Sequence, residues 1–390
     1  MIENNNNYYN QQENTVIQNK LISISKRSRV TPFTRRVEAA GVKSYMVYNH
    51  MLLPTLFRTR EEDYWHLCEH VQVWDVSCER QVEVVGPDAD RLVQLMTPRD
   101  LSKTALLQGK YAPICDHKGF VLNDPIIIKM GPNRWWISIA SSDVKLFAKG
   151  LAIGMGLDVE VFEPDVFPLA VQGPKAEQLV ARVFGDEVKS IGFFRGKMLP
   201  FQGVDIYVAR SGWSKQGGFE IYLHDPSLAE PLWDELFAKG EDLNVGAGSP
   251  NGIERVEAGL LSYGSDMDET HTPFDCGLDS YLDLNADIES LSLPVLKALA
   301  GKQTLKFMGL VFDSKLDTEQ FENRTGGLDV LHNGKVVGEI TSHVWSPRYK
   351  KYLALAMLNK EFADTNETVQ LGQHSGRIHE LPFAKSALEA

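Results

Sequence analysis

The segment RSGWSKQGGFEIYL, residues 210–223, has a carboxylate inside a run that alternates like a β-strand. Glu220 and Tyr222 are two residues apart, so in a strand they share one face, and the apolar residues around them share the other. Burying a charge without a partner is costly, so Glu220 either faces water or holds a ligand. A carboxylate accepts two parallel N–H bonds, which is the pattern that the edge of a pterin or guanine ring presents.

Two further residues have types and settings that suit chemistry. Asp124 precedes the apolar run PIIIKM, where it either forms an Asx-type turn that introduces a strand or points into a pocket. In a pocket, this carboxylate could accept a proton. Trp213 lies in a polar, glycine-rich turn, where a large ring is either a platform for a ligand or an anchor for the loop.

Composition excludes several classes of protein. The chain has 390 residues and a formal net charge of -12, which argues against a general nucleic-acid binder. No apolar stretch is long enough to span a bilayer, and the Asn-rich start lacks the features of a signal peptide. The four cysteines form no CxxC pair, and the histidines have no metal-ligand spacing. We therefore expect a cytoplasmic protein with reduced thiols, no metal, no membrane and no nucleic-acid partner.

The elements that position these residues are mixed. The segment 61–77 reads as a helix that leads into a strand, and 114–124 reads as a hairpin around Lys118-Gly119. VEVVGPDADRLVQLM and PLAVQGPKAEQLVARVF each read as a strand, a Gly-Pro turn and an amphipathic helix. This repetition predicts a duplicated α+β core, although a Gly-Pro turn is also a common link between a strand and a helix. From residue 293 onward, short apolar runs and the tight turn HNGK predict a separate β-barrel or sandwich.

These motifs together resemble those of the folate-dependent aminomethyltransferases, the family of the glycine cleavage T-protein. RSGWSKQGGFE corresponds to the family's R-T-G-Y-T-G-E-D-G-F-E, GFVLND to G-G-x-x-D-D, and VWDVSCE to L-F-D-V-S-H. RVEAGLLSYG corresponds to R-L-E-A-x-x-x-x-Y-G, DMDETHTP to D-M-D-E-x-x-x-P, and GEITSHVWSP to G-E-I-T-S-G-x-x-S-P.

The resemblance implies an α+β fold with three domains around a central folate channel. We expect a disordered Asn-rich tail at 1–22 and a folate-binding α+β domain from 23–80 plus 160–250. A second α+β domain would comprise 81–159 plus 251–292, and a C-terminal β-domain 293–390.

The resemblance also implies a tetrahydrofolate site. Glu220 matches the glutamate that grips the pterin ring, and Asp124 matches the catalytic aspartate near N5 and N10. Tyr111 and Arg255 match residues of the folate pocket. Trp213 replaces the family's tyrosine, so we assign it both to the folate pocket and to the substrate site.

Departures from the family motifs indicate a different substrate. Lys215 and Gln216 replace the acidic pair of the family motif, and Cys78 replaces its histidine. The chain is most similar to the branch that moves a methyl group from the sulfonium of dimethylsulfoniopropionate to N5 of tetrahydrofolate. A sulfonium has a fixed positive charge that suits aromatic faces, and we assign Tyr222 and Trp213 to that role.

Alternatives remain at this stage. A T-protein-type aminomethyltransferase or another folate-dependent N-demethylase is one, and a non-catalytic folate-binding protein is a second. The expected partners are a small sulfonium molecule and folate, with a homodimer as one candidate assembly.

Overall fold

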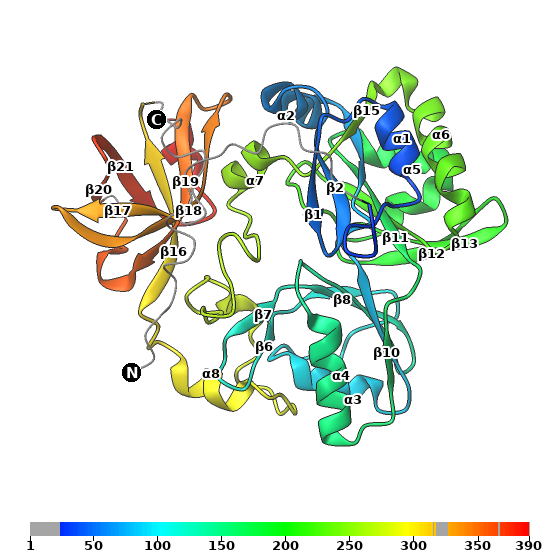
Figure 1. The fold of residues 1–390 in the computed structure, drawn as a ribbon, viewed down its shortest axis with the longest axis horizontal. Coiled ribbons are helices and arrows are strands. Elements are labelled where there is room, and N and C mark those ends of the chain that lie inside the picture. Colours follow the sequence, from blue (N-terminus) through cyan, green and yellow to red (C-terminus); the bar gives the residue numbers. More distant parts are fainter. Residues whose placement is uncertain (1–23, 315, 317–326, 366, 390) are drawn as a thin grey trace.

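The computed structural model describes residues 24–314, 316, 327–365 and 367–389, so the predicted disordered tail at 1–22 lies outside the described residues. Three lobes surround a central segment that contains helix α7 (Gly252–Ala258) (Figure 1). Two lobes combine a sheet with helices, and the third is a closed β-barrel. The α+β class and the three-part architecture that the sequence predicts are confirmed.

The first lobe is a six-stranded sheet in the order β12-β13-β14-β11-β3-β15, antiparallel except for the parallel pair β3 and β15. Helices α1, α5 and α6 lie together against it (Figure 1). Alternating apolar side chains of the strands form one core with these helices. The bounds are β3 (Val71–Asp75), β11 (Phe167–Gln172), β12 (Gly196–Phe201), β13 (Val204–Ala209), β14 (Gly218–Leu223), β15 (Val245–Gly248), α1 (Thr34–Ala39), α5 (Ala176–Phe184) and α6 (Ala229–Lys239).

The second lobe is a five-stranded antiparallel sheet in the order β10-β4-β9-β8-β5. Its apolar face packs against helices α3 and α4. The bounds are β4 (Gln81–Val85), β5 (Gly109–Tyr111), β8 (Ile126–Gly131), β9 (Arg134–Ser138), β10 (Glu160–Phe162), α3 (Ala89–Met96) and α4 (Val144–Met155). The predicted domain boundaries stay a proposal, and strand pairing places β10 in this sheet rather than with the 160–250 segment.

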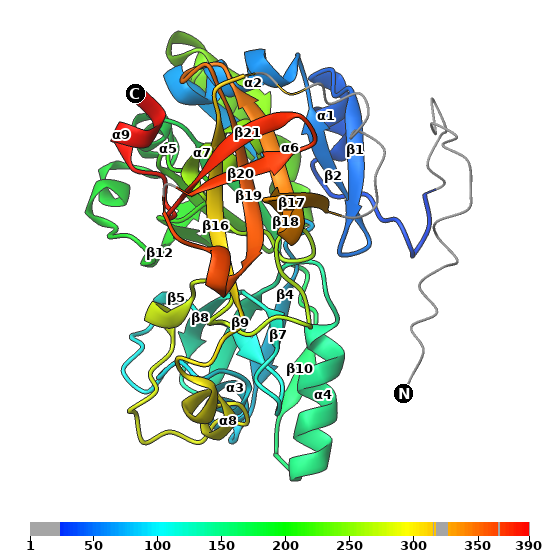
Figure 2. The same ribbon diagram turned by 90° about the vertical axis from the view of Figure 1, so that its left-hand side faces the viewer.

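The third lobe begins after helix α8 (Leu293–Leu299) and ends in helix α9 (Lys385–Glu389). Its six strands close in the order β16-β19-β18-β17-β20-β21 (Figure 2), which selects the barrel over the sandwich. In the predicted tight turn, Asn333 and Gly334 have φ of 50° and 77°, the values that such a hairpin requires. The bounds are β16 (Leu305–Phe312), β17 (Leu328–His332), β18 (Lys335–Ser346), β19 (Lys351–Asn359), β20 (Thr368–Leu371) and β21 (His374–His379).

Three smaller elements complete the fold around the centre. Strands β1 (Ser44–Tyr48) and β2 (Met51–Leu56) form a hairpin, and helix α2 (Arg60–Glu69) follows it. The predicted hairpin around Lys118-Gly119 is present as β6 (Ile114–Cys115) and β7 (Val121–Asn123). This second hairpin leads directly to Asp124.

The repeated Gly-Pro turn has the same geometry in both sheets. Gly86, after β4, has φ of 137°, and Gly173, after β11, has φ of 123°, a region that L-residues avoid. A Cβ added at Gly86 would lie 2.6 Å from the carbonyl oxygen of Asp158, and one at Gly173 would lie 2.4 Å from that of His70. The repetition in the sequence is therefore a repeated strand–turn–helix unit, in which glycine lets a neighbouring backbone approach.

Replacing Gly173 with alanine is expected to lower the free energy of unfolding by roughly 2–4 kcal/mol, because the new Cβ meets a backbone oxygen in a strained conformation. Gly150→Ala is the matched control, since nothing lies within 4 Å of a Cβ at this helical position. Urea denaturation measures both. Equal stability of the two variants would show that the turn relaxes without cost.

Candidate active site

Glu220 lies in β14, and its carboxylate is buried at the inner face of the first sheet. Only 7% of the residue is exposed, so the solvent-facing alternative is wrong. The hydroxyl of Ser211 donates to Oε2, and that of Tyr222 donates to the same oxygen over 3.2 Å. Within the described part of the chain, Oε1 has no hydrogen-bond partner. Burial raises the pKa of Glu220, and the two hydroxyl donors partly offset this.

The ring of Tyr222 lies at the contact between the two sheets. Its centroid is 5.2 Å from that of Tyr207 in β13 and 6.1 Å from that of Trp136 in β9 of the second sheet. Trp135, the neighbour of Trp136, points to the opposite face, into the core under α3 and α4. The sequence shows that these two tryptophans must separate, but it does not show that Trp136 and Tyr207 would meet Tyr222.

Asp124 follows β7 and is held next to Tyr111 of β5. The Tyr111 hydroxyl donates to Oδ2 of Asp124 over 3.0 Å, so two of the predicted residues meet directly. Burial raises the pKa of Asp124 to about 7, and the nearby charge of Asp266 adds to the effect, whereas the Tyr111 hydrogen bond opposes it. A carboxylate that titrates near neutral pH can both accept and return a proton.

Glu79, which the sequence reasoning did not single out, lies between these two carboxylates. It belongs to the segment 76–80 that carries the chain from β3 in the first sheet to β4 in the second. Burial, together with the charges of Glu220 and Asp124, raises the pKa of Glu79 to about 8. The site therefore contains three carboxylates that repel one another, contributed by both sheets and by the link between them. The signal in the sequence that could have pointed to Glu79 was a charged residue directly after the largely apolar stretch VWDVSC.

Trp213 and Arg255 meet each other beside α7. The guanidinium carbon of Arg255 lies 5.7 Å from the ring centroid of Trp213. The same guanidinium donates to Asp266 and to the hydroxyl of Ser342 in the barrel. Trp213 is half-buried in this contact, which supports the loop-anchor alternative, and no contact joins it to Tyr222 among the described residues.

The residues that depart from the family motif hold the same loop. The Lys215 ammonium group donates to the carbonyl of Ala258 at the C-terminal end of α7 over 2.7 Å, where the helix dipole favours a positive charge. Its backbone N–H donates to Glu254 over 2.7 Å, and the amide of Gln216 reaches the same carboxylate oxygen. These two side chains therefore fasten the 211–217 loop to α7.

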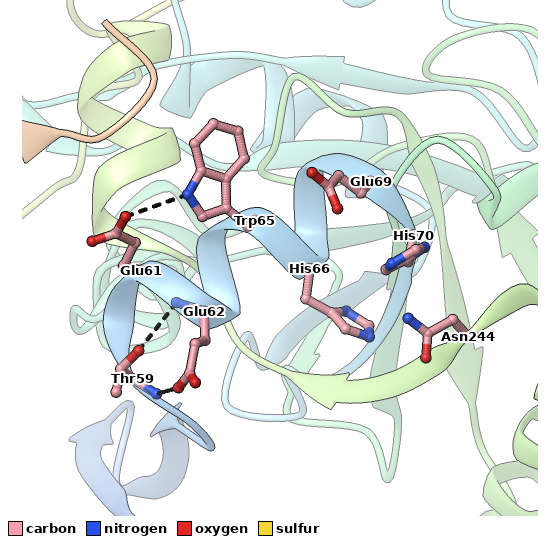
Figure 3. Close-up of a pocket in the computed structure, with 8 residues that line it drawn as sticks. All are labelled: Thr59, Glu61, Glu62, Trp65, His66, Glu69, His70 and Asn244. Carbon is pink, nitrogen blue, oxygen red and sulfur yellow. Dashed lines mark hydrogen bonds between the residues drawn. The ribbon is translucent and has the colours of Figure 1, made fainter. Parts of the chain in front are cut away.

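A surface pocket of about 490 Å³ lies on α2 (Figure 3). Thr59 and Glu62 form a capping box at the start of the helix, and Trp65 donates to Glu61. Burial lowers the pKa of His66 to about 4, so its ring is neutral near pH 7. None of the predicted site residues lines this pocket.

Three further observations concern the cysteines, possible metal ligands and the helices. All four cysteines are free thiols, and three of them are buried. Across the described ranges, no three His, Cys, Asp or Glu side chains are grouped so that they could hold a metal ion. None of the described helices is long and apolar enough to cross a membrane.

The family follows from comparison with known proteins. Residues 33–286 match the GCVT N-terminal domain, and residues 306–385 match the glycine cleavage T-protein C-terminal barrel domain. The chain belongs to the glycine cleavage T-protein family. A crystal structure of the glycine cleavage system aminomethyltransferase T from Bartonella henselae superimposes with a TM-score of 0.80, covering 92% of this chain and 99% of that one, at 21% identity. That structure shows the common fold.

Individual relatives differ in how similar they are. The chain is 50% identical over 336 residues to dimethylsulfoniopropionate demethylase DmdA of Ruegeria pomeroyi, covering 86% of this chain and 91% of the relative. It is 28% identical to an aminomethyltransferase of Clostridium botulinum (strain Okra / Type B1), over 86% of this chain and 90% of that one. The similarity to the demethylase is thus clearly the greater of the two.

Proposed function

We propose that this protein is a tetrahydrofolate-dependent demethylase. It transfers a methyl group from the sulfonium of dimethylsulfoniopropionate to N5 of tetrahydrofolate and yields methylmercaptopropionate and 5-methyltetrahydrofolate. The observation that carries the proposal is the 50% identity, across 91% of the relative's length, to a demethylase of this substrate. The proposal also includes a cytoplasmic location and small-molecule partners. It includes a homodimer, which light scattering of the purified protein would test.

The buried carboxylate of Glu220 fits tetrahydrofolate. Its Oε2 is held by Ser211 and Tyr222, and its Oε1 has no hydrogen-bond partner among the described residues. Because this oxygen is not among the fully buried polar atoms without partners, it remains open to the donors of a ligand. The N–H edge of a pterin supplies such donors, so we assign the pterin end to Glu220.

A second pocket fits the other end of folate, which carries carboxylates. It has a volume of about 340 Å³ and lies between β2, α7 and β18. Arg60 and Arg255 line it, together with the hydroxyl-bearing residues Thr341 and Ser342. Guanidinium groups are good partners for carboxylates. We therefore assign Arg255 to the anionic end, where its pairing with Asp266 fixes its orientation.

The reaction needs little covalent chemistry from the protein. Tetrahydrofolate supplies N5 as the methyl acceptor. The bond from carbon to sulfur breaks with its electron pair left on sulfur, the methyl group is gained by N5, and one proton is released. The leaving group is a neutral thioether, so the main task of the protein is to align the reacting atoms. Asp124, with a pKa raised to about 7, holds the released proton.

We assign the walls of the substrate site to the buried aromatic side chains near Glu220. Tyr222, Tyr207 and Trp136 stand at mutual centroid distances of 5.2 to 6.2 Å. Such rings attract a cation through their electron-rich faces and exclude water from the reacting atoms. We keep Tyr222 as a substrate residue and add Trp136 to it. Trp213 is held by Arg255, so we place it on the folate side.

Incubation of the protein with dimethylsulfoniopropionate and tetrahydrofolate tests the proposal. Mass spectrometry should detect methylmercaptopropionate and 5-methyltetrahydrofolate in equal amounts, and neither product without the protein. The absence of both would exclude this substrate.

The same assay separates the alternatives. Turnover of an aminomethyl-loaded lipoyl carrier, or of N-methylated glycines, in place of the sulfonium would identify an aminomethyltransferase or an N-demethylase. Tight tetrahydrofolate binding without turnover of any of them would identify a folate-binding module.

A further inference from the structure

Glu79 is the one carboxylate of this centre for which the proposed chemistry has no task. Glu220 holds the pterin edge and Asp124 holds the proton. No hydrogen bond and no ion pair to the Glu79 carboxylate is present in the part of the chain that the structure describes, although its backbone N–H is bonded to Val76. Its carboxylate oxygens have no hydrogen-bond partner among the described residues, yet they are not among the fully buried polar atoms without partners. They are therefore open to a ligand or solvent. Glu79 thus offers the site a carboxyl group that no described side chain pairs, and this group is negatively charged above its pKa of about 8.

Backbone contacts place Glu79 beside Tyr222 on one side. In the first sheet, Tyr222 of β14 lies opposite Pro168 of β11. The hydroxyl of Ser77, two residues before Glu79, contacts the carbonyl of Pro168 over 3.4 Å. The segment 76–80, which links the two sheets, therefore leaves the first sheet level with Tyr222. The charge of Glu79 also contributes to the raised pKa of Tyr222, as this proximity requires.

Backbone contacts place Glu79 near Asp124 on the other side. The carbonyl of Arg80, the next residue, accepts the N–H of Ile139 over 3.1 Å. Ala140 follows Ile139, and its carbonyl accepts the side-chain amide of Asn123, the neighbour of Asp124. The link therefore enters the second sheet next to the segment that carries Asp124.

The hairpin β1–β2 closes this arrangement. The side-chain amide of Asn49 donates to the carbonyl of Cys78 over 3.0 Å and to that of Ile139 over 3.2 Å, which ties the hairpin to the link and to the end of β9 in the second sheet. Tyr48 precedes Asn49, and the charges of Glu79 and Asp124 both contribute to its raised pKa. Glu79 accordingly lies close enough to interact with two phenol side chains and two further carboxylates.

We propose that Glu79 is the negative counter-charge for the sulfonium and that it sets selectivity for a sulfonium group over an uncharged group of the same shape. The inference rests on the proposed function. Tyr48 and Tyr222 stay neutral because their pKa values are raised, so their rings attract the sulfonium only weakly, whereas an ionised Glu79 adds a full opposite charge. A permanent positive charge placed among three repelling carboxylates relieves their repulsion. The sulfur of the product is uncharged and the product keeps only its carboxylate, so Glu79 no longer attracts the product and favours its release.

The test uses Glu79→Gln, which keeps the shape of the side chain and removes its charge. Above pH 8, where Glu79 is ionised, the KM for dimethylsulfoniopropionate is expected to rise roughly 5- to 30-fold, the size expected when one partner of a partly screened charge pair is neutralised. The inhibition constant of 4-methylpentanoate, in which a CH group replaces the charged sulfur, should stay unchanged. Glu79→Asp should recover part of the selectivity, and Glu160→Gln, at an exposed position on β10, is the matched control.

A pH series provides a second readout. Glu79 has a pKa raised to about 8, so in the wild type the KM for the sulfonium should fall as the pH rises through about 8. The Gln variant should lose this step. Glu220 and Asp124 also face Glu79, and the wild type and the Gln variant both retain them. Tyr48, Tyr222 and Cys78 face it too, but their raised pKa values keep them neutral in this range.

The outcomes are distinguishable. If Glu79→Gln weakens the sulfonium and 4-methylpentanoate equally, or leaves both unchanged, Glu79 is not the counter-charge. If the wild type forms no product from dimethylsulfoniopropionate while it binds tetrahydrofolate, the proposed function itself is wrong. Unchanged tetrahydrofolate affinity in the variant excludes misfolding as the cause of a raised KM.

Discussion

Replacing Asp124 with asparagine is expected to lower kcat by roughly 100- to 10,000-fold, the range that a positioned acid or base contributes. The asparagine keeps the shape of the side chain and can still accept the hydrogen bond from Tyr111, but it cannot accept a proton. Tetrahydrofolate should therefore remain bound while turnover is lost. Single-turnover formation of 5-methyltetrahydrofolate and the equilibrium affinity for tetrahydrofolate measure the two quantities separately.

The pH dependence of kcat adds a check on the same residue. The pKa of Asp124 is raised to about 7, so the base form is populated above this value. In the wild type, kcat should rise with pH below about 7 and level off above it. Tyr111→Phe removes the hydrogen bond that favours the charged form, so the midpoint should move to higher pH.

Asp205→Asn, at an exposed position on β13, is the matched control and should leave kcat unchanged. Full activity of Asp124→Asn would contradict the assignment, because the proton would then leave directly to water. Loss of folate binding in this variant would instead mean that Asp124 holds the folate.

Replacing Glu220 with glutamine should weaken tetrahydrofolate binding by roughly 100-fold or more. Hydrogen bonds to a charged group contribute about 1.5–3 kcal/mol each, and the pterin edge offers more than one donor. Glutamine can still accept from Ser211 and Tyr222, so the local fold should persist. Isothermal titration with tetrahydrofolate measures the loss, and thermal unfolding of the unliganded variant checks its stability.

The Glu220 variant has a second consequence, at Glu79. The charge of Glu220 is part of what raises the pKa of Glu79, so its removal should shift the pH step in the sulfonium KM to lower pH. Unchanged folate affinity in Glu220→Gln would show that the pterin lies elsewhere. An unchanged pH step would show that the two carboxylates do not interact.

Several features of the fold and the site could be predicted from the sequence because they depend on local rules. A strand has a period of two, so Glu220 and Tyr222 had to share a face, and the structure places both on the face opposite the core. The repeated Gly-Pro turns predicted the duplicated strand–turn–helix units, since only glycine permits that backbone approach. The family resemblance assigned Asp124 and Tyr111, which lie in different motifs, to one folate site, and the structure joins the two side chains by a hydrogen bond.

The role of Trp213 depended on contacts that are distant in the chain. A tryptophan in a polar turn suits either a ligand platform or an anchor, and local sequence does not separate the two. The guanidinium of Arg255 stands over the ring, and Lys215 binds the end of the same helix, so the loop is fastened to α7. The substitutions that distinguish this loop from the family motif thus serve its attachment to α7.

By itself, the sequence determined the α+β class, the barrel-forming C-terminal segment, and the identity of Glu220 and Asp124 as the carboxylates of interest. Only the tertiary structure decided that Glu79 completes the centre. The chain passes from one sheet to the other through residues 76–80, and this crossing brings Glu79 between two carboxylates that come from different sheets. Charges interact through space, so their mutual repulsion, and the space for a cation among them, exists only once both sheets have packed together.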